Sequence, residues 1–102
     1  MTDLPKIMLI VNSQATNFTA RKLKVIVSAL NSLGNLKTVH TKDRGHASEI
    51  AKESAENGVD IVFVLAGDGT LNEAAQSLIN TNTVLAPIPG GSTNVFSRAI
   101  GY

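Results

Sequence analysis

The feature that most constrains this chain is a regular alternation between short apolar runs and segments that carry an apolar stripe at helical spacing. Short continuous runs rich in branched residues are typical of strands buried on both faces of a sheet. Apolar residues three or four positions apart are typical of amphipathic helices. The alternation therefore predicts an α/β fold, with three layers in the order α/β/α and a mostly parallel, Rossmann-like sheet.

Four segments are predicted strands. Residues 7–11 and 61–66 are the two continuous apolar runs and indicate buried strands. Residues 36–40 alternate between apolar and polar, which favours a half-exposed or edge position. Residues 84–88 contain Pro87, which cannot donate to a ladder and therefore indicates an edge or an irregularity. The sequence leaves the order of the strands open.

Four helices are predicted between and after these strands. Apolar residues from Leu23 to Leu33 form one stripe, and Gly34 supplies its stop. Residues 47–55 carry a narrow stripe of small residues, which allows close packing on the sheet. Residues 71–78 form a third stripe, and residues 95–100 a short terminal helix.

Composition bounds the class of protein. A chain of 102 residues with 43% hydrophobic residues predicts one globular domain over residues 1–102. The net charge of +1 gives no basic field of the kind that binds nucleic acid. The absence of cysteine excludes disulfides and thiolate catalysis. Because no run could span a bilayer and the start lacks a secretory pattern, we expect a cytoplasmic protein.

The predicted topology indicates where ligands should bind. Loops that follow parallel strands all emerge at the carboxyl edge of the sheet, where open α/β sheets bind their ligands. Those loops are residues 12–17, 41–46, 67–70 and 89–94. They hold most of the unusual residues of the chain, so we expect the site to be built from them.

Two of these loops are rich in glycine and directly precede predicted helices. Gly67 and Gly69 let a ligand approach the main chain, and the free N–H groups of a helix start suit phosphate. Residues 90–94 repeat the arrangement and add hydroxyl and amide side chains. The alternative is structural: glycines can make a tight turn, and Thr70 with Glu73 forms a capping-box pattern.

Asp68 stands between two glycines at this predicted anion site. A carboxylate there would repel phosphate unless it held Mg²⁺, directly or through water. The alternative is a turn aspartate bonded to its own loop. Other motifs are missing: the chain has no Walker-type P-loop, no complete dinucleotide fingerprint and no serine-hydrolase elbow.

Residues 64–73, Val-Leu-Ala-Gly-Asp-Gly-Thr-Leu-Asn-Glu, resemble the Gly-Gly-Asp-Gly-Thr-x-Asn-Glu signature of the diacylglycerol kinase catalytic domain family. Residues 89–101 resemble that family's Pro-x-Gly-Thr-x-Asn segment, and residues 10–16 its first loop. The wider superfamily takes in NAD kinases and 6-phosphofructokinases. Ala66 departs from the pattern by replacing the first glycine of the signature, and Ser92 keeps the hydroxyl of the family's threonine.

The resemblance implies a nucleotide-binding domain with ATP and Mg²⁺ as cofactors. Asp68 would act on the phosphates through Mg²⁺, directly or by way of water. The residues that would line the nucleotide are Asn12, Ser13, Gln14, Ala15, Thr16, Thr41, Gly67, Asp68, Gly69, Thr70, Asn72, Glu73, Gly91, Ser92 and Asn94.

The resemblance also implies an ATP-dependent lipid kinase that moves the γ-phosphate to a lipid hydroxyl. The family places a β-rich second domain, with the lipid cleft and the general base, after this one, and these residues end at Tyr102. We therefore expect residues 1–102 alone to be inactive. Two alternatives stay open: an NAD or sphingoid kinase-like domain, and a non-catalytic module that self-associates. Peripheral contact with the inner membrane face and a homodimer also stay open.

Overall fold

The computed structural model describes residues 4–12, 20–41, 43–66 and 68–88, with the side chain of Asp68 left out. Within them, strands and helices alternate as the apolar pattern predicts. The elements are β1 (Lys6–Val11), α1 (Ala20–Asn31), β2 (Asn35–His40), α2 (His46–Glu56), β3 (Ile61–Leu65), α3 (Asp68–Leu78) and β4 (Val84–Ile88). The predicted terminal helix over residues 95–100 and the loop of residues 89–94 lie outside the described residues.

The four strands form one sheet in the order β2-β1-β3-β4, and every neighbouring pair is parallel. The α/β fold class is therefore confirmed. The half-exposed segment of residues 36–40 lies in β2, at one edge of the described sheet. Pro87 lies in β4, at the other edge, opposite Val64 in the register. Both edge predictions are confirmed, and the two continuous apolar runs form the central strands.

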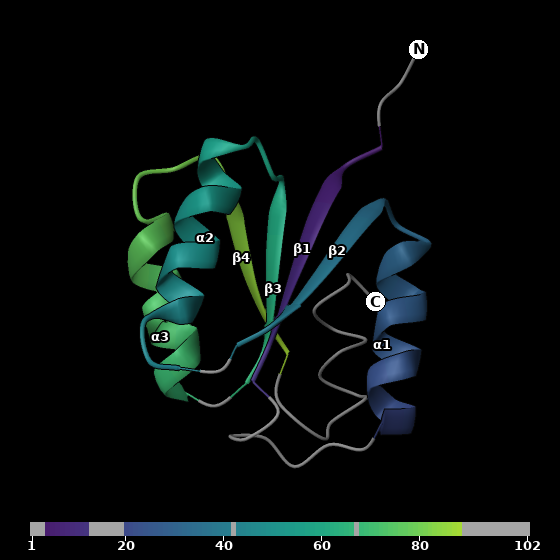
Figure 1. The fold of residues 1–102 in the computed structure, drawn as a ribbon. Coiled ribbons are helices and arrows are strands. Elements are labelled where there is room, and N and C mark those ends of the chain that lie inside the picture. The colour runs from purple at the N-terminus through teal and green to yellow at the C-terminus, as the bar shows by residue number, and fades with distance from the viewer. Residues whose placement is uncertain (1–3, 13–19, 42, 67, 89–102) are drawn as a thin grey trace.

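The helices divide between the two faces of the sheet. Helix α1 covers one face, and α2 and α3 lie together on the other (Figure 1). Side chains alternate along each strand, so Leu9 and Val11 pack toward α1 while Met8 and Ile10 pack toward α2 and α3. The predicted three layers are therefore present, with a separate apolar core on each face.

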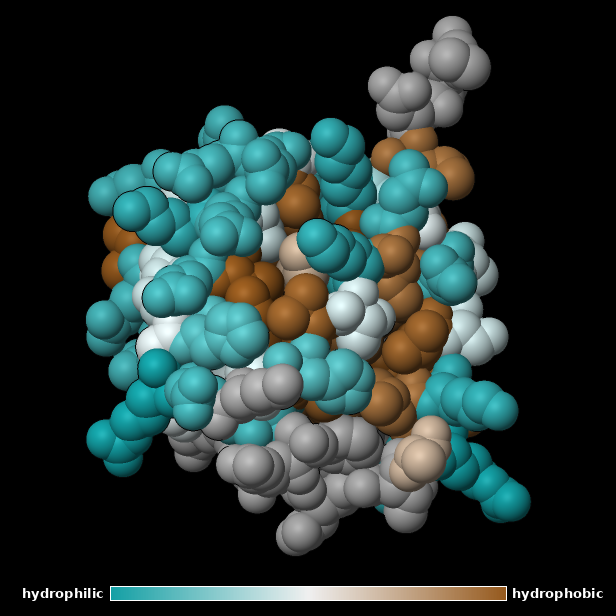
Figure 2. Space-filling model, in the orientation of Figure 1, coloured by the Kyte–Doolittle hydropathy of each residue, from teal (hydrophilic) through white to brown (hydrophobic). Residues whose placement is uncertain are grey.

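The layer of α2 and α3 leaves a groove of about 520 Å³ beside α2, over β1 and β2. Apolar side chains are exposed in the middle of this face, between polar side chains (Figure 2). Met8, Val39 and Ile50 contribute to the groove, with Lys37 and Glu53 beside them. Residues predicted to bind nucleotide do not line it. This groove is therefore separate from the site that the sequence predicts.

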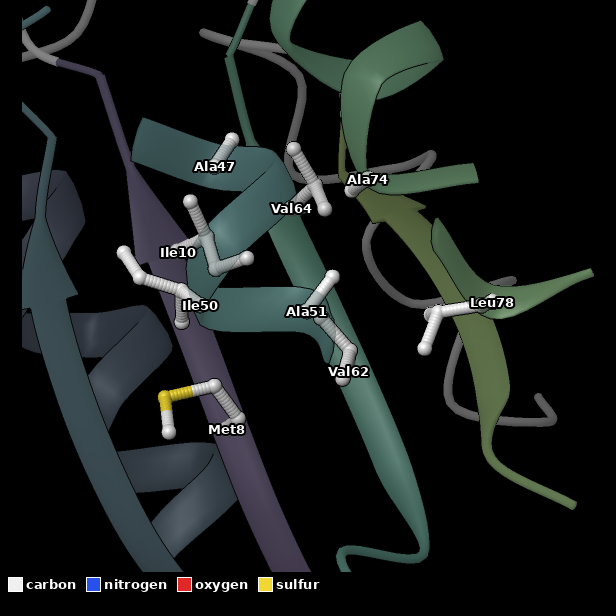
Figure 3. Packing of buried hydrophobic residues seen from close by; sticks show 9 residues of the cluster. All are labelled: Met8, Ile10, Ala47, Ile50, Ala51, Val62, Val64, Ala74 and Leu78. Atoms are coloured by element: carbon white, nitrogen blue, oxygen red, sulfur yellow. The ribbon is translucent and has the colours of Figure 1, made fainter. Parts of the chain in front are cut away.

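Small residues bring α2 and α3 close to the sheet and to each other. Ala51 of α2 lies over Val62 of β3, and Ala74 of α3 lies beside Val64 (Figure 3). Both alanines are fully buried. Where the two helices meet, the hydroxyls of Ser48 and Ser77 are hydrogen-bonded at 2.6 Å. The predicted close packing of the small-residue stripe is confirmed, and it extends to a direct contact between helices.

Candidate functional site at the carboxyl edge of the sheet

The carboxyl ends of β1 and β3 lie side by side at the centre of the sheet. The chain leaves β1 toward α1 and β2 on one side, and leaves β3 toward α3 and β4 on the other (Figure 1). Such a divergence is a topological switch point, where open α/β sheets bind ligands. Asn12 lies there, because its main-chain N–H donates to the carbonyl oxygen of Leu65 at 3.1 Å.

The side chain of Asn12 joins the end of β1 to the first turn of α3. Its Nδ2 donates a hydrogen bond to Oγ1 of Thr70 at 3.0 Å, across 58 residues of sequence. Thr70 lies in the first turn of α3. Because its oxygen accepts from Asn12, the hydroxyl proton of Thr70 points elsewhere as a donor. The structure therefore brings together two residues that the sequence assigns to one site.

Thr41 lies at the same edge but is turned inward. Its main-chain N–H and its hydroxyl both donate to the carbonyl oxygen of Val11, at 2.8 and 3.3 Å. The residue is 7% exposed. The hydroxyl of Thr41 is thus used to hold the end of β2 against the end of β1.

Glu73 reaches from α3 to the loop before α2. Its Oε1 accepts the main-chain N–H of Gly45 at 3.0 Å. Gly45 has a φ of 85°, in the left-handed region that glycine adopts without strain. The capping-box reading is not borne out, since α3 already begins at Asp68 and Thr70 lies inside its first turn. Gly45 was not among the predicted site residues, although a glycine directly before an apolar stripe signals a helix start.

The start of α3 is open. A Cβ added at Gly69 would meet no atom within 4 Å, and both Gly69 and Asn72 are exposed. The first N–H groups of a helix have no partner inside the helix and attract anions. The beginning of α3 is therefore suited to bind phosphate. The remaining predicted residues lie outside the described part of the chain: Ser13, Gln14, Ala15, Thr16, Gly67, Gly91, Ser92 and Asn94.

The described residues contain no group of three His, Cys, Asp or Glu side chains that could hold a metal ion. Oγ1 of Thr70 and Oε1 of Glu73 already accept hydrogen bonds, from Asn12 and from Gly45. Mg²⁺ prefers oxygen ligands and is often held by one or two carboxylates together with substrate phosphates. Asp68, at the first position of α3, is one such carboxylate residue, so the residue types at this helix start are compatible with Mg²⁺.

In the described part of the chain, each helix is too short or too polar to cross a membrane.

The fold is α/β, and this edge places a candidate ligand site at a topological switch point. The family model of the diacylglycerol kinase catalytic domain matches residues 6–102. The chain belongs to that family.

Two curated relatives with kinase names match this chain. A diacylglycerol kinase of Bacillus subtilis is 41% identical over 59 residues, which cover 56% of this chain and 20% of that protein. A protein of Escherichia fergusonii named "Probable lipid kinase YegS" is 31% identical over 106 residues, covering 99% of this chain and 35% of its own length. This chain thus spans about a third of the length of the second relative, and the match covers a fifth of the first.

A crystal structure shares the architecture. The diacylglycerol kinase of Bacillus anthracis superposes with a TM-score of 0.76 at 37% identity. The match covers 96% of this chain and 37% of the other. The sheet and its three helices therefore match a portion of a larger kinase chain.

Proposed function

We propose that this chain is the ATP-binding part of a lipid kinase, whose full activity transfers the γ-phosphate of ATP to a lipid hydroxyl. The observation that carries the proposal is the hydrogen bond between Asn12 and Thr70. It holds the loop after β1 beside the open start of α3, at the point where α/β sheets bind ligands. Names of relatives favour a lipid acceptor over NAD.

Each residue of this edge would have a binding or orienting role. The N–H groups in the first turn of α3 would bind phosphate oxygens, and the exposed backbone at Gly69 would allow them to approach. Asn12 would orient the hydroxyl of Thr70 toward the phosphates. Asp68, at the first position of α3, would hold Mg²⁺, directly or through water. When bound, Mg²⁺ neutralises phosphate charge.

Phosphoryl transfer depends mainly on positioning and charge stabilisation. Because an acceptor must be positioned as well as ATP, we propose that residues 1–102 bind nucleotide without turning over lipid. A cytoplasmic location, with the full kinase touching the inner membrane face, is part of the same proposal, since a lipid acceptor resides in a membrane.

The test is a calorimetric titration of the chain with ATP, with and without Mg²⁺. We expect Asp68→Asn to lower Mg²⁺-dependent affinity by roughly tenfold or more, because a lost charge-assisted contact is worth about 1.5–3 kcal/mol. Asp60→Asn is the matched control, since Asp60 precedes β3 at the opposite edge.

Equal Mg²⁺ dependence in Asp68→Asn and the parent chain would contradict the role of this carboxylate. If the parent chain binds no ATP·Mg²⁺ and sedimentation shows a dimer, the self-association alternative replaces the proposed function.

A further inference from the structure

The N-cap residue of helix α2 makes no side-chain capping bond. That residue is Gly45, which has no side chain. The nearest acid on the helix itself is Glu49, in the first turn. The N–H of Gly45 is instead bound by Glu73, which comes from α3, 28 residues further along the chain. A carboxylate at this position also lies near the positive end of the α2 dipole.

The loop between β2 and α2 is therefore held at both ends by other elements. At its start, Thr41 donates two hydrogen bonds to the carbonyl oxygen of Val11 in β1. At its end, Gly45 donates to Glu73 in α3. Because this loop follows β2 at the carboxyl edge, where the proposed nucleotide site lies, holding Gly45 against α3 fixes the end of the loop relative to the start of that helix.

The chemistry of the bond separates two roles for Glu73. A group that holds Mg²⁺ or acts by its charge needs the carboxylate. A group that only accepts an N–H needs an oxygen, which a glutamine amide also supplies at the same position, although as a weaker, neutral acceptor. Glu73 is part-buried in this bond, and its Oε1 accepts the N–H of Gly45.

We propose that Glu73 is a positioning residue, which holds the β2–α2 loop in place for nucleotide by accepting the N–H of Gly45. This inference rests on the proposed function, and it replaces direct contact of Glu73 with the nucleotide by an action through the loop.

The test compares Glu73→Ala with Glu73→Gln in the chain, using two readouts. The first is hydrogen exchange of the Gly45 amide, followed by NMR without nucleotide. The second is the affinity for ATP·Mg²⁺. We expect Glu73→Ala to speed the exchange and to weaken ATP·Mg²⁺ binding by roughly three- to tenfold, the equivalent of one hydrogen bond. Glu73→Gln should keep most of the protection of the Gly45 amide and most of the affinity, and lie closer to the parent chain than Glu73→Ala in both.

Glu56→Ala is the matched control, because Glu56 is an exposed glutamate at the far end of α2. It should change neither readout. Circular dichroism shows whether Glu73→Ala keeps its fold, and Glu73→Gln carries the test if it does not.

Loss of affinity in Glu73→Gln with a normal Gly45 amide would overturn the inference, since it would assign Glu73 a role through its charge. Unchanged exchange and affinity in a folded Glu73→Ala would overturn it as well. Failure of the parent chain to bind ATP·Mg²⁺ is a different result: it contradicts the proposed function itself, and the inference falls with it.

Discussion

Hydrogen bonds lie at both edges of the sheet, but they connect different parts of the chain. Those at the amino edge connect neighbouring strands, and those at the carboxyl edge connect loops and helices. At the amino edge, Asp60 donates its N–H to the carbonyl oxygen of Lys6 and accepts the N–H of Val84, both at 2.9 Å. Its carboxylate also accepts the N–H of Lys6 at 2.8 Å. These bonds continue the ladder between strands. At the carboxyl edge, the side chain of Asn12 bonds to the first turn of α3, and that of Glu73 bonds to the loop before α2.

The two edges therefore differ in what their hydrogen bonds contribute to stability and to ligand binding. Bonds that prolong the ladder stabilise the sheet, and losing one should lower the free energy of unfolding. Bonds that fix separate segments against each other at the carboxyl edge would also shape the proposed ligand site, so losing one should additionally lower the affinity for ATP. Substitutions at the two edges test this distinction, because each predicts a different combination of change in the free energy of unfolding and in the affinity for ATP.

The largest effect is expected from Gly34→Ala at the amino edge. An added Cβ would lie 2.3 Å from the carbonyl oxygen of Pro5, which also accepts the N–H of Asn35 at 2.8 Å. Because backbone must move, the free energy of unfolding should fall by about 2–3 kcal/mol. Urea denaturation measures it, and the folded fraction should keep its affinity for ATP.

Gly69→Ala is the counterpart at the carboxyl edge. Its Cβ meets no atom within 4 Å, and alanine is the better helix former, so stability should hold or rise by up to about 1 kcal/mol. ATP affinity should fall, because the methyl group stands where phosphate would approach. A stable variant with unchanged affinity would contradict that approach.

Asn12→Ala is expected to have an intermediate effect. Removing the donor to Thr70 should lower the free energy of unfolding by about 1 kcal/mol and weaken ATP several-fold. A double-mutant cycle with Thr70→Val should give a coupling of about 0.5–1.5 kcal/mol in unfolding. Strictly additive effects of the two substitutions would show that this bond does not join the loops in solution.

Asp60→Ala is expected to have the smallest effect. It removes the carboxylate that accepts the N–H of Lys6, while the main-chain bonds of Asp60 remain. The free energy of unfolding should fall by about 0.5–1 kcal/mol, and the affinity for ATP should be unchanged. Weaker nucleotide binding in this variant would remove the distinction between the two edges.

Much of the fold could be predicted because each pattern of apolar residues indicates whether a strand is buried on both faces or lies at an edge of the sheet. The run at residues 7–11 is apolar on both faces, and it became a central strand with Leu9 and Ile10 fully buried on opposite sides. The alternating β2 became an edge. The order β2-β1-β3-β4 could not be predicted, because pairing depends on which strands meet in space.

The same limit applies to the site. The carboxyl-edge loops could be assigned from topology alone, but the bond between Asn12 and Thr70 needs β1 beside β3. The bond between Glu73 and Gly45 needs α2 packed against α3. Sequence spacing suggested a local capping box for Glu73, and tertiary packing provided a more distant partner instead.

The strand order also has a consequence for how the chain reaches its native state. Strand β1, one of the two central strands, comes first of the four, yet its two partners, β2 and β3, begin at residues 35 and 61. Pairing across such separations requires closing long loops, which slows folding. During synthesis, the apolar segment Ile7–Val11 therefore has to wait for roughly fifty further residues before both its edges are covered, an interval in which it is prone to aggregate and suited to capture by a chaperone.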